Sequence, residues 1–518
     1  MRYIYSLKKK EERNKTNLKN YEDKIKTVLK CLGVEKEGYV AVNDDSFEFS
    51  FSGCVLKGHL KYMGKLLVSS GICKHGFIRQ KNKAYAFLSY DESRVEDEQV
   101  LVEFIDCSML NLEDIDDNQN DIPKWVNFYS KVELSTSYIS VEMAENIFYK
   151  HDGHYNEFTK KSNDIFLVEL NYRHIKKDKY LKANDILKNE VDKSCINSIK
   201  KNTCVIEHLY SSGNYQTDYI DLVDVKLINM VSDSEKESIR AKFEFEIESS
   251  IEPDYKRNIL DIDKDKKYIF TVYNVGQALA TSLREKEKQP FFYFDYGIAC
   301  RRNKFTLPDD IKLPVAEGAT ILLSHVHEDH WCGFRINSEV FKCRWIITQK
   351  PTKALLKVFS SVYLNGGSII NLYKKDIFNI KITNNWLAFG NEKSRIEPAR
   401  IPNKFHESGN ALYIFAKHKG NKYNIVVSGD QDYDYQDKVY LNNINLLVAC
   451  HHGGIYSWNT RSIIPTPVDK KNIIIYSYGK DNVYHHPSQV ERYQEKGWRT
   501  EHHTPENGNY EIELELGK

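Results

Sequence analysis

Three histidines and an aspartate lie close together near the middle of this chain. They are His325, His327, Asp329 and His330, in the pattern H-x-H-x-D-H. Neutral imidazole and carboxylate groups are the ligands that zinc, manganese and iron(II) prefer in proteins. A chance cluster of surface histidines is the alternative, but packing gives no reason for three imidazoles and a carboxylate at this spacing. The pattern therefore predicts a metal site.

The ligand pattern directly follows an apolar run. Residues 319–323 have the composition of a buried strand, so the ligands would stand on the loop at its end, where a rigid scaffold holds them. Three further strand-like runs, at residues 291–294, 425–427 and 446–450, also end in polar residues. These are Asp295, Asp430, His451 and His452. We expect the four to converge with the first pattern on one edge of a sheet sandwich.

A centre with two metal ions needs more ligands than the first pattern supplies. Each ion takes about three protein ligands, and a carboxylate commonly bridges the pair. The candidates are Asp430, which follows Gly429, the pair His451 and His452, and His406, which precedes a strand-like run at residues 411–415. Asp430 alone would also suit a helix cap, and His451-His452 alone would suit a loop. Their joint occurrence at strand ends favours a two-metal centre.

The order of these motifs resembles the metallo-β-lactamase fold superfamily. The motifs are Asn-Val-Gly-Gln at 274–277, Phe-Asp-Tyr-Gly at 294–297, the histidine pattern at 325–330, Ser-Gly-Asp at 428–430 and His-His-Gly-Gly at 451–454. Within that superfamily the chain is most similar to the soluble domain of the ComEC family of DNA-uptake proteins, which the segment 477–487 also suggests. The resemblance covers residues from about 268 to the end. It implies a four-layer αββα sandwich with a binuclear metal centre at one edge.

The resemblance also implies a role for each matching residue. His325 and His327 would hold the first metal, Asp329 and His330 the second, and Asp430 would bridge them. Zinc or manganese would be the expected ions.

The resemblance also bears on the other candidate residues, and for some of them it leaves alternatives. His451 or His452 would complete the second metal, and both stay open. Asp295 corresponds to an aspartate that orients the ligand loop from behind. His406 is either a ligand or only adjacent to the asparagine-containing segment 409–412.

The expected chemistry is metal-assisted hydrolysis, in which two cations bring the pKa of a water towards neutrality and stabilise charge on the substrate. Phosphodiesters suit such a pair, so the leading hypothesis is a nuclease or phosphodiesterase acting on DNA or RNA. The catalytic candidates are Asp329, His486 and Lys480. His486 and Lys480 would contact phosphate or protonate the leaving group. Alternatively, Pro487 fixes a loop in which His485 and His486 only pack on their neighbours.

Two other functions remain open. The superfamily also includes enzymes for small phosphodiesters, cyclic nucleotides, lactones and thioesters, and a fold by itself does not choose among them. The chain could also be the effector subunit of a multi-component system, such as one for phage defence. In that case the N-terminal region would bind a protein partner that activates the enzyme.

The length of 518 residues exceeds what one core usually supports, so at least two domains are expected. We assign residues 1–265 to a mixed, β-rich N-terminal region and 266–518 to the hydrolase, which makes the fold class α+β. The first region begins with a predicted amphipathic helix at 9–32, and an acidic stretch at 112–121 could divide it. Strands are predicted at 39–42, 47–51, 84–88, 100–105, 220–228 and 241–247.

Overall composition suggests no membrane and no general affinity for nucleic acid. The net charge is +1, so any basic surface must be local. The N-terminus lacks the apolar core of a signal peptide, and no apolar run approaches the roughly 18 residues that span a bilayer. The ten cysteines are scattered without a C-x-x-C pair, as in proteins of a reducing compartment. We therefore expect a cytoplasmic protein.

Overall fold

The computed structural model describes most of residues 262–372, 409–454 and 464–516, part of 381–390, and separate strands and helices between residues 39 and 243. The chain divides into two compact units. One comprises residues 1–87, 137–206 and 216–231, and the other residues 88–136, 207–215 and 232–518. The helix predicted at 9–32, the linker predicted at 112–121 and His406 lie outside the described residues.

Antiparallel strands make up the described part of the first unit. β1 (Tyr39–Asn43), β2 (Ser46–Phe51) and β3 (Cys54–His59) form consecutive hairpins. In a larger sheet β9 (Ile165–Lys176) pairs with both β4 (Lys81–Asp91) and β12 (Tyr219–Met230), and β10 (Thr203–Val205) pairs with β12. The strands predicted at 39–42, 47–51, 84–88 and 220–228 are therefore confirmed. Other short elements of the first unit are η3 (Glu145–Tyr149), β7 (Lys150–His151) and β8 (His154–Tyr155), whereas β11 (Glu207–His208) and the start of β6 (Leu134–Ser140) belong to the second.

The strand predicted to begin at residue 241 is wrong for its first residues, because they end a helix. α7 spans Asp233–Phe243, with Asp233 and Glu235 in its first turn and Arg240 and Lys242 in its last. Those charges complement the helix dipole at each end. The alternation of Phe and Glu around residue 243 suggested a strand, but it comes after a stretch with good helix-forming residues.

Segments early in the chain belong to the second unit together with residues 232–518. They include β5 (Gln99–Asp106), which confirms the strand predicted at 100–105, and α3 (Lys124–Lys131). α9 (Lys353–Leu364) meets both of them: Lys353 Nζ lies 2.7 Å from Glu103 Oε2, and Lys357 Nζ donates to the carbonyl oxygen of Tyr129 at 3.1 Å. The domain boundary at residue 265 stays a prediction.

One large mixed sheet dominates the second unit, and its first half contains six strands. These are β13 (Lys267–Val272), β14 (Ala280–Glu285), β15 (Phe292–Tyr296), β16 (Thr320–Leu322), β17 (Arg344–Ile347) and β18 (Ser368–Asn371). β13, β14 and β15 are antiparallel, and β15 to β18 are parallel. The carboxyl ends of the four parallel strands therefore share one edge of the sheet.

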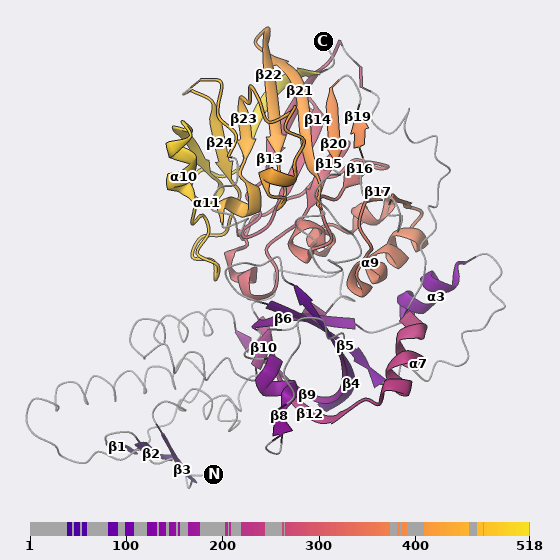
Figure 1. Ribbon diagram of the computed structural model, residues 1–518, viewed down its shortest axis with the longest axis vertical. Coiled ribbons are helices and arrows are strands. Elements are labelled where there is room, and N and C mark those ends of the chain that lie inside the picture. The colour runs from indigo at the N-terminus through magenta and orange to yellow at the C-terminus, as the bar shows by residue number, and fades with distance from the viewer. Residues whose placement is uncertain are drawn as a thin grey trace, which may run out of the picture. The chain divides into compact units, whose positions relative to one another are not determined.

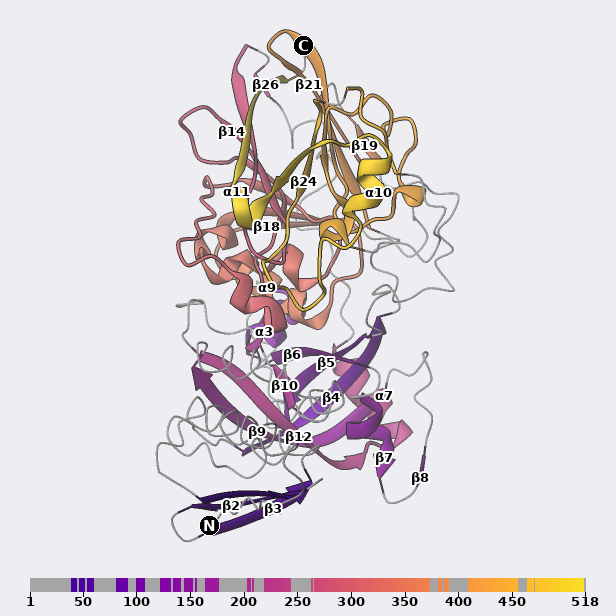
Figure 2. The same cartoon turned by 90° about the vertical axis from the view of Figure 1, so that its left-hand side faces the viewer.

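The second half repeats this pattern (Figure 1). Its strands are β21 (Ala411–His418), β22 (Asn421–Val427), β23 (Leu446–Val448), β24 (Ile473–Tyr476) and β25 (Thr500–His503), with β20 (Leu387–Gly390) and β19 (Lys381–Thr383) beside β21. β21 and β22 are antiparallel, and β22 to β25 are parallel. The last strand, β26 (Tyr510–Leu516), pairs with β13 in the first half and with β21 in the second (Figure 2).

A single hydrophobic core joins the two halves. It contains Phe294, Leu322 and Ile346 from the first half and Val427 and Val448 from the second, all nearly inaccessible to solvent. Since successive side chains of a strand point to opposite faces, the residues between these face outwards. This alternation explains why the runs at 319–323, 425–427 and 446–450 are almost entirely apolar, since both faces of these strands are covered.

Helices cover the outward faces. Trp345 of β17 packs against Phe359 of α9, with ring centroids 5.9 Å apart. On the other half, Tyr493 of α10 (Val490–Glu495) joins a second core with Leu447 and Tyr476. A short helix, α11 (Thr504–Asn507), precedes β26. The result is a mixed α/β fold with large sheets and few helices. Among the helices that the structure describes, none combines the length and the apolar character needed to cross a bilayer.

Candidate metal centre

The candidate ligands come from equivalent positions in the two halves of the sheet. In the first half, His325 stands three residues after Leu322, the last residue of β16. In the second half, Asp430 and His451 stand three residues after Val427 and Val448, which are partners in the parallel pair β22–β23. Parallel pairing therefore brings the two later loops to the same edge, as the sequence predicted.

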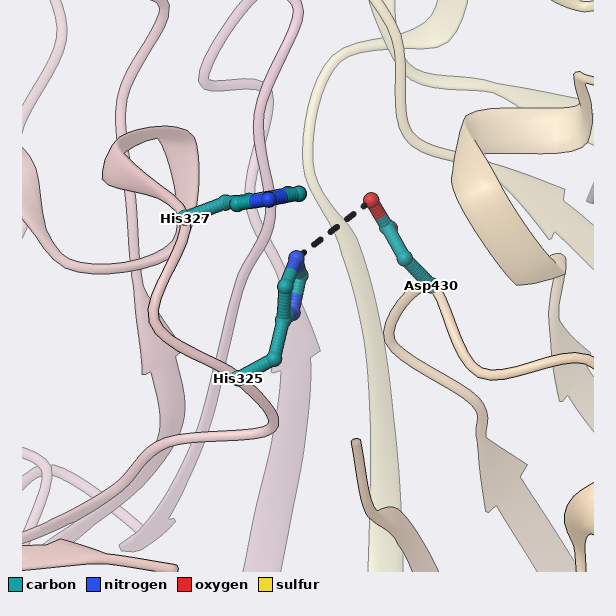
Figure 3. A group of neighbouring side chains, drawn as sticks. All are labelled: His325, His327 and Asp430. Atoms are coloured by element: carbon teal, nitrogen blue, oxygen red, sulfur yellow. Dashed lines mark ion pairs between the residues drawn. The ribbon is translucent and has the colours of Figure 1, made fainter. Parts of the chain in front are cut away.

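The structure brings six of the predicted ligands into two buried groups. Within each group the potential ligand atoms all lie within 4.8 Å of one another. The first group is His325, His327 and Asp430, and the second is Asp329, His330 and His452. Figure 3 shows the first group, in which two imidazole rings from one loop and a carboxylate from another lie around a common centre. Each group could hold one metal ion.

Asp430, a member of the first group, also faces the second group. Its Oδ2 atom is 3.7 Å from His325 Nε2 and 3.9 Å from His451 Nε2. Its Oδ1 atom is 3.4 Å from His330 Nε2 and 3.7 Å from His452 Nε2. One carboxylate oxygen thus faces each set of histidines, which is the arrangement required of a bridging ligand. Burial alone would raise the pKa of Asp430, but the nearby His330, His451 and His452 lower it well below its usual range, which favours the ionised form.

Asp295 orients His330 from behind. Its Oδ2 atom is 2.8 Å from His330 Nδ1, so the ring presents Nε2 to Asp430. The same carboxylate accepts from the backbone N–H of Ser324 at 2.7 Å and from its hydroxyl at 2.8 Å. Burial would lower the pKa of His330, but the carboxylates of Asp430 and Asp295 raise it well above its ordinary value. Buried carboxylates thus lie close to both nitrogens of His330, and a cation bound beside Nε2 would offset their charge.

Unsatisfied nitrogen atoms support a metal in the second group. In the described part of the chain, the Nε2 atoms of His330 and His452 are buried without a hydrogen-bond partner. His452 Nδ1 is engaged with the carbonyl oxygen of Ser477 at 2.8 Å, so its Nε2 is the atom turned to Asp329 and Asp430. Buried polar atoms are rarely left unpaired because the loss of hydration costs free energy. Together with two carboxylates, these nitrogens fit the ligand preferences of zinc or manganese.

Side chains from neighbouring loops hold the ligand loop in place. The backbone N–H of Val326 donates to Gln349 Oε1 at 3.0 Å, and the Val326 carbonyl accepts from Trp331 Nε1 at 2.9 Å. The buried amide of Asn410 donates to the carbonyl of Ser324 at 3.3 Å. Asn410 belongs to the segment that the sequence left open as an alternative to His406. It supports the ligand loop, whereas His406 lies outside the described residues.

Glu328 stands between ligands in sequence but faces away from them. It is buried and forms ion pairs with two buried arginines, Arg301 and Arg335, the latter at 2.6 Å. This pairing connects the ligand loop to η4 (Arg301–Thr306) and η6 (Cys332–Arg335). Sequence reasoning did not assign Glu328 a role. Its position next to Asp329 could have marked Glu328 as a candidate, but its partner Arg301 lies far away in the sequence.

The second half holds its ligands through backbone conformation. Gly429 has φ +55°, and a Cβ atom there would lie 2.7 Å from the side chain of Ser324. The Gly429 carbonyl accepts from the backbone N–H of His451 at 3.0 Å. His451 and His452 have backbone φ values of 49° and 57°, which residues other than glycine rarely adopt. Gly453 follows with a φ of 80°. Such a conformation costs free energy and is frequent at functional sites.

The two other catalytic candidates occupy different environments. His486 is buried, its ring centroid is 5.0 Å from that of His451, and its Nδ1 atom is 2.9 Å from Gln277 Nε2. Lys480 is exposed, and its neighbour Gly479 contacts Gln277 through its backbone. The structure thus brings His486 beside the candidate ligands. Cys332 donates to the carbonyl oxygen of Ile298 at 3.1 Å.

No protein-family model matches this chain, and neither does any curated protein. Among solved structures, it is similar to an isothiocyanate hydrolase from Delia radicum gut bacteria, with 13% sequence identity and a TM-score of 0.27. The alignment covers 46% of this chain and 98% of the other. A likeness of this degree does not establish a shared fold, so the interpretation of the site rests on its own geometry.

Proposed function

We propose that this chain is a metal-dependent hydrolase of the metallo-β-lactamase superfamily that holds two divalent cations. The observation that carries the proposal is the position of Asp430, whose two oxygen atoms face two different sets of buried histidines. A buried carboxylate is costly unless positive charge lies beside it, and one cation on each side would supply that charge. The helix-covered halves of the sheet, with ligands at one edge, support an αββα sandwich, and the resemblance of the sequence motifs favours the ComEC-like type.

The ligand assignment follows from this geometry. His325, His327 and Asp430 would hold one ion, and Asp329, His330 and His452 would hold the other, with Asp430 shared. His451, on the Oδ2 side of Asp430, would add to the first ion rather than the second. Two bound cations supply an acidic water near neutral pH and charge stabilisation for the substrate.

The protein's own residues then bind and orient the substrate. Asp329 and His451 are each 8% exposed, whereas His330 is fully buried, so the substrate would approach from the side of Asp329 and His451. His486 lies beside His451 and can contact the substrate there. We propose a phosphodiester substrate, DNA or RNA first, because phosphate oxygens can bind two cations at once and the segment 477–487 resembles that of the DNA-uptake family.

The proposal is tested on the full-length chain by metal analysis and hydrolysis assays. After loading with zinc or manganese and removal of excess metal, we expect two ions per chain. We expect cleavage of linear, circular or single-stranded nucleic acid, and loss of both cleavage and bound metal in His325→Ala and Asp329→Ala. His418→Ala, at the end of β21 and hydrogen-bonded to the Glu513 carbonyl, is the matched control and should retain both.

Two results would overturn parts of the proposal. Cleavage that persists in both variants would exclude this site as the catalytic centre. Hydrolysis of bis-p-nitrophenyl phosphate without cleavage of any nucleic acid would keep the hydrolase and replace the substrate with a small phosphodiester.

A further inference from the structure

Gln277 connects two segments that lie far apart in the sequence. It follows β13, is buried, and its side chain reaches the C-terminal segment at two points. Its Oε1 atom accepts from the backbone N–H of Gly479 at 3.2 Å, and its Nε2 atom lies 2.9 Å from His486 Nδ1. Its own backbone N–H donates to Thr306 Oγ1 at 3.0 Å. Two contacts therefore hold the side-chain amide of Gln277, and a third holds its backbone.

These contacts determine the orientation of the amide. A backbone N–H can only donate, so the atom facing Gly479 must be the amide oxygen. The NH₂ group then faces His486, and since an amide nitrogen only donates, His486 Nδ1 must accept. A neutral imidazole that accepts at Nδ1 carries its proton on Nε2. Gln277 thus selects one of the two tautomers of His486.

The Nε2 side of His486 lies against the loop that carries two candidate ligands. A Cβ atom built on Gly454 would be 2.1 Å from His486 Nε2, so only glycine allows this approach. The ring is stacked with that of His452, with centroids 6.1 Å apart, and is perpendicular to that of His451. The selected proton is therefore on the side of the ring that faces Gly454, in the loop that begins with the candidate ligands His451 and His452.

The segment around His486 is itself rigidly held. Asn482 Oδ1 accepts from the backbone N–H of His486 at 3.0 Å, and Asn482 Nδ2 donates to the carbonyl oxygens of His486 at 2.7 Å and Gly479 at 2.8 Å. A Cβ atom on Gly479 would lie 2.7 Å from the backbone nitrogen of Gln277. Glycine at position 479 lets the two segments approach closely enough for the side-chain amide of Gln277 to contact both Gly479 and His486.

We infer that Gln277 is a positioning residue that holds His486 with its proton on Nε2, so that His486 donates a hydrogen bond to the leaving-group oxygen of the substrate. The inference rests on the proposed hydrolase function. Such a hydrogen bond stabilises the negative charge that develops on the leaving oxygen in the transition state. Its contribution is greatest when the leaving group is a poor one, because that oxygen then carries more charge.

The kinetic test compares two substrates that differ only in the leaving group. Methyl p-nitrophenyl phosphate releases a stabilised phenolate, and methyl phenyl phosphate a less stable one. Gln277→Glu keeps the acceptor for Gly479 but removes the donor to His486. We expect it to lower kcat for the phenyl ester about ten-fold more than for the nitrophenyl ester, with bound metal unchanged. In a His486→Gln background Gln277→Glu should have no further effect on kcat.

A second measurement reads the tautomer without any substrate. In the zinc-loaded, ¹⁵N-histidine-labelled chain, the His486 signals are assigned by their loss in His486→Gln. We expect an unprotonated Nδ1 and a protonated Nε2 in the natural chain, and a protonated Nδ1 in Gln277→Glu, because the carboxylate accepts where the amide donated. Gln489→Glu, where Oε1 accepts from Arg492, is the matched control and should change neither tautomer nor kcat.

The outcomes separate the inference from the function on which it rests. If the natural chain hydrolyses neither these esters nor any nucleic acid, the proposed phosphodiesterase function fails, and the spectrum still decides the tautomer. If the esters are hydrolysed but Gln277→Glu slows both equally, or the natural chain has its proton on Nδ1, the role of Gln277 is overturned. The spectrum of the natural chain gives this answer even if the Gln277 variant does not fold.

Discussion

The two halves of the large sheet supply the candidate metal ligands in different ways. In the first half, one loop after β16 carries four of them within six residues. In the second half, Asp430 comes from the loop after β22, and His451 and His452 come from the loop after β23. The first arrangement is visible in the sequence as a pattern. The second becomes a site only when parallel strands bring two loops together.

The supports of the two halves also differ. The loop after β16 is held by side chains, through Asp295, Gln349 and the Glu328–arginine pairs. The loops of the second half are held by backbone atoms in left-handed conformations, with glycines at positions where a Cβ atom would collide. The first half should therefore be sensitive to the loss of a polar group, and the second to the addition of a methyl group.

Asp430→Asn tests the residue that joins the halves and should have the largest effect. Neutralising the carboxylate removes the charge shared by both sets of histidines. We expect the loss of both ions and a fall in activity greater than the 10- to 100-fold that typically follows loss of an outer partner. Metal content and kcat measure it. Retention of two ions at natural affinity would show that Asp430 is not a bridge.

Glu328→Gln tests the support of the first half. The variant leaves the guanidinium groups of Arg301 and Arg335 buried with less compensating charge. Breaking a buried pair in this way typically costs about 3–5 kcal/mol of stability. Chemical unfolding of the full chain should show the loss. Glu339→Gln, where the exposed carboxylate pairs with Lys342, is the control and should lose less than about 1 kcal/mol.

Asp295→Asn tests a residue that supports a candidate ligand, His330, without being a ligand itself. The amide keeps the size of the carboxylate but lowers the negative charge behind His330 Nδ1. We expect metal affinity to fall by about 10- to 100-fold, while the ligand loops in the second half of the sheet are unaffected. Competition with a chelator measures it, with the exposed Asp310→Asn as control. An unchanged affinity would mean that His330 needs no orienting partner.

Gly453→Ala tests the second half and should have the smallest effect. The new Cβ atom would lie 2.5 Å from the Tyr476 ring, at a φ of +80°. Gly420 has the same φ of +80°, but nothing lies within 4 Å of a Cβ atom there, so Gly420→Ala is a matched control. Both variants should lose about 1 kcal/mol of stability through backbone strain, and only Gly453→Ala should lose more through the collision and also weaken metal binding. Equal effects on metal affinity would contradict the role of the left-handed loop.

Much of this arrangement could be predicted because local patterns encode it. The apolar runs at 319–323 and 425–427 correspond to β16 and the end of β22, since strands covered on both faces must be apolar along their length. The strand predicted at 241–247 failed at its start, because alternation over a few residues also occurs at the end of a helix. The role of Glu328 could not be predicted, because it depends on Arg301, a partner distant in sequence.

The sequence by itself determined the chemistry of the ligands and the strands that carry them. Imidazole and carboxylate at short spacing after apolar runs are local features, and they depend on no long-range contact. Only the tertiary structure decided that His452 joins Asp329 and His330, that His451 faces the other oxygen of Asp430, and that Gln277 meets His486. These relations depend on the register of parallel strands and on left-handed backbone at residues 451–453, which arise only when the two halves of the sheet pack around one core.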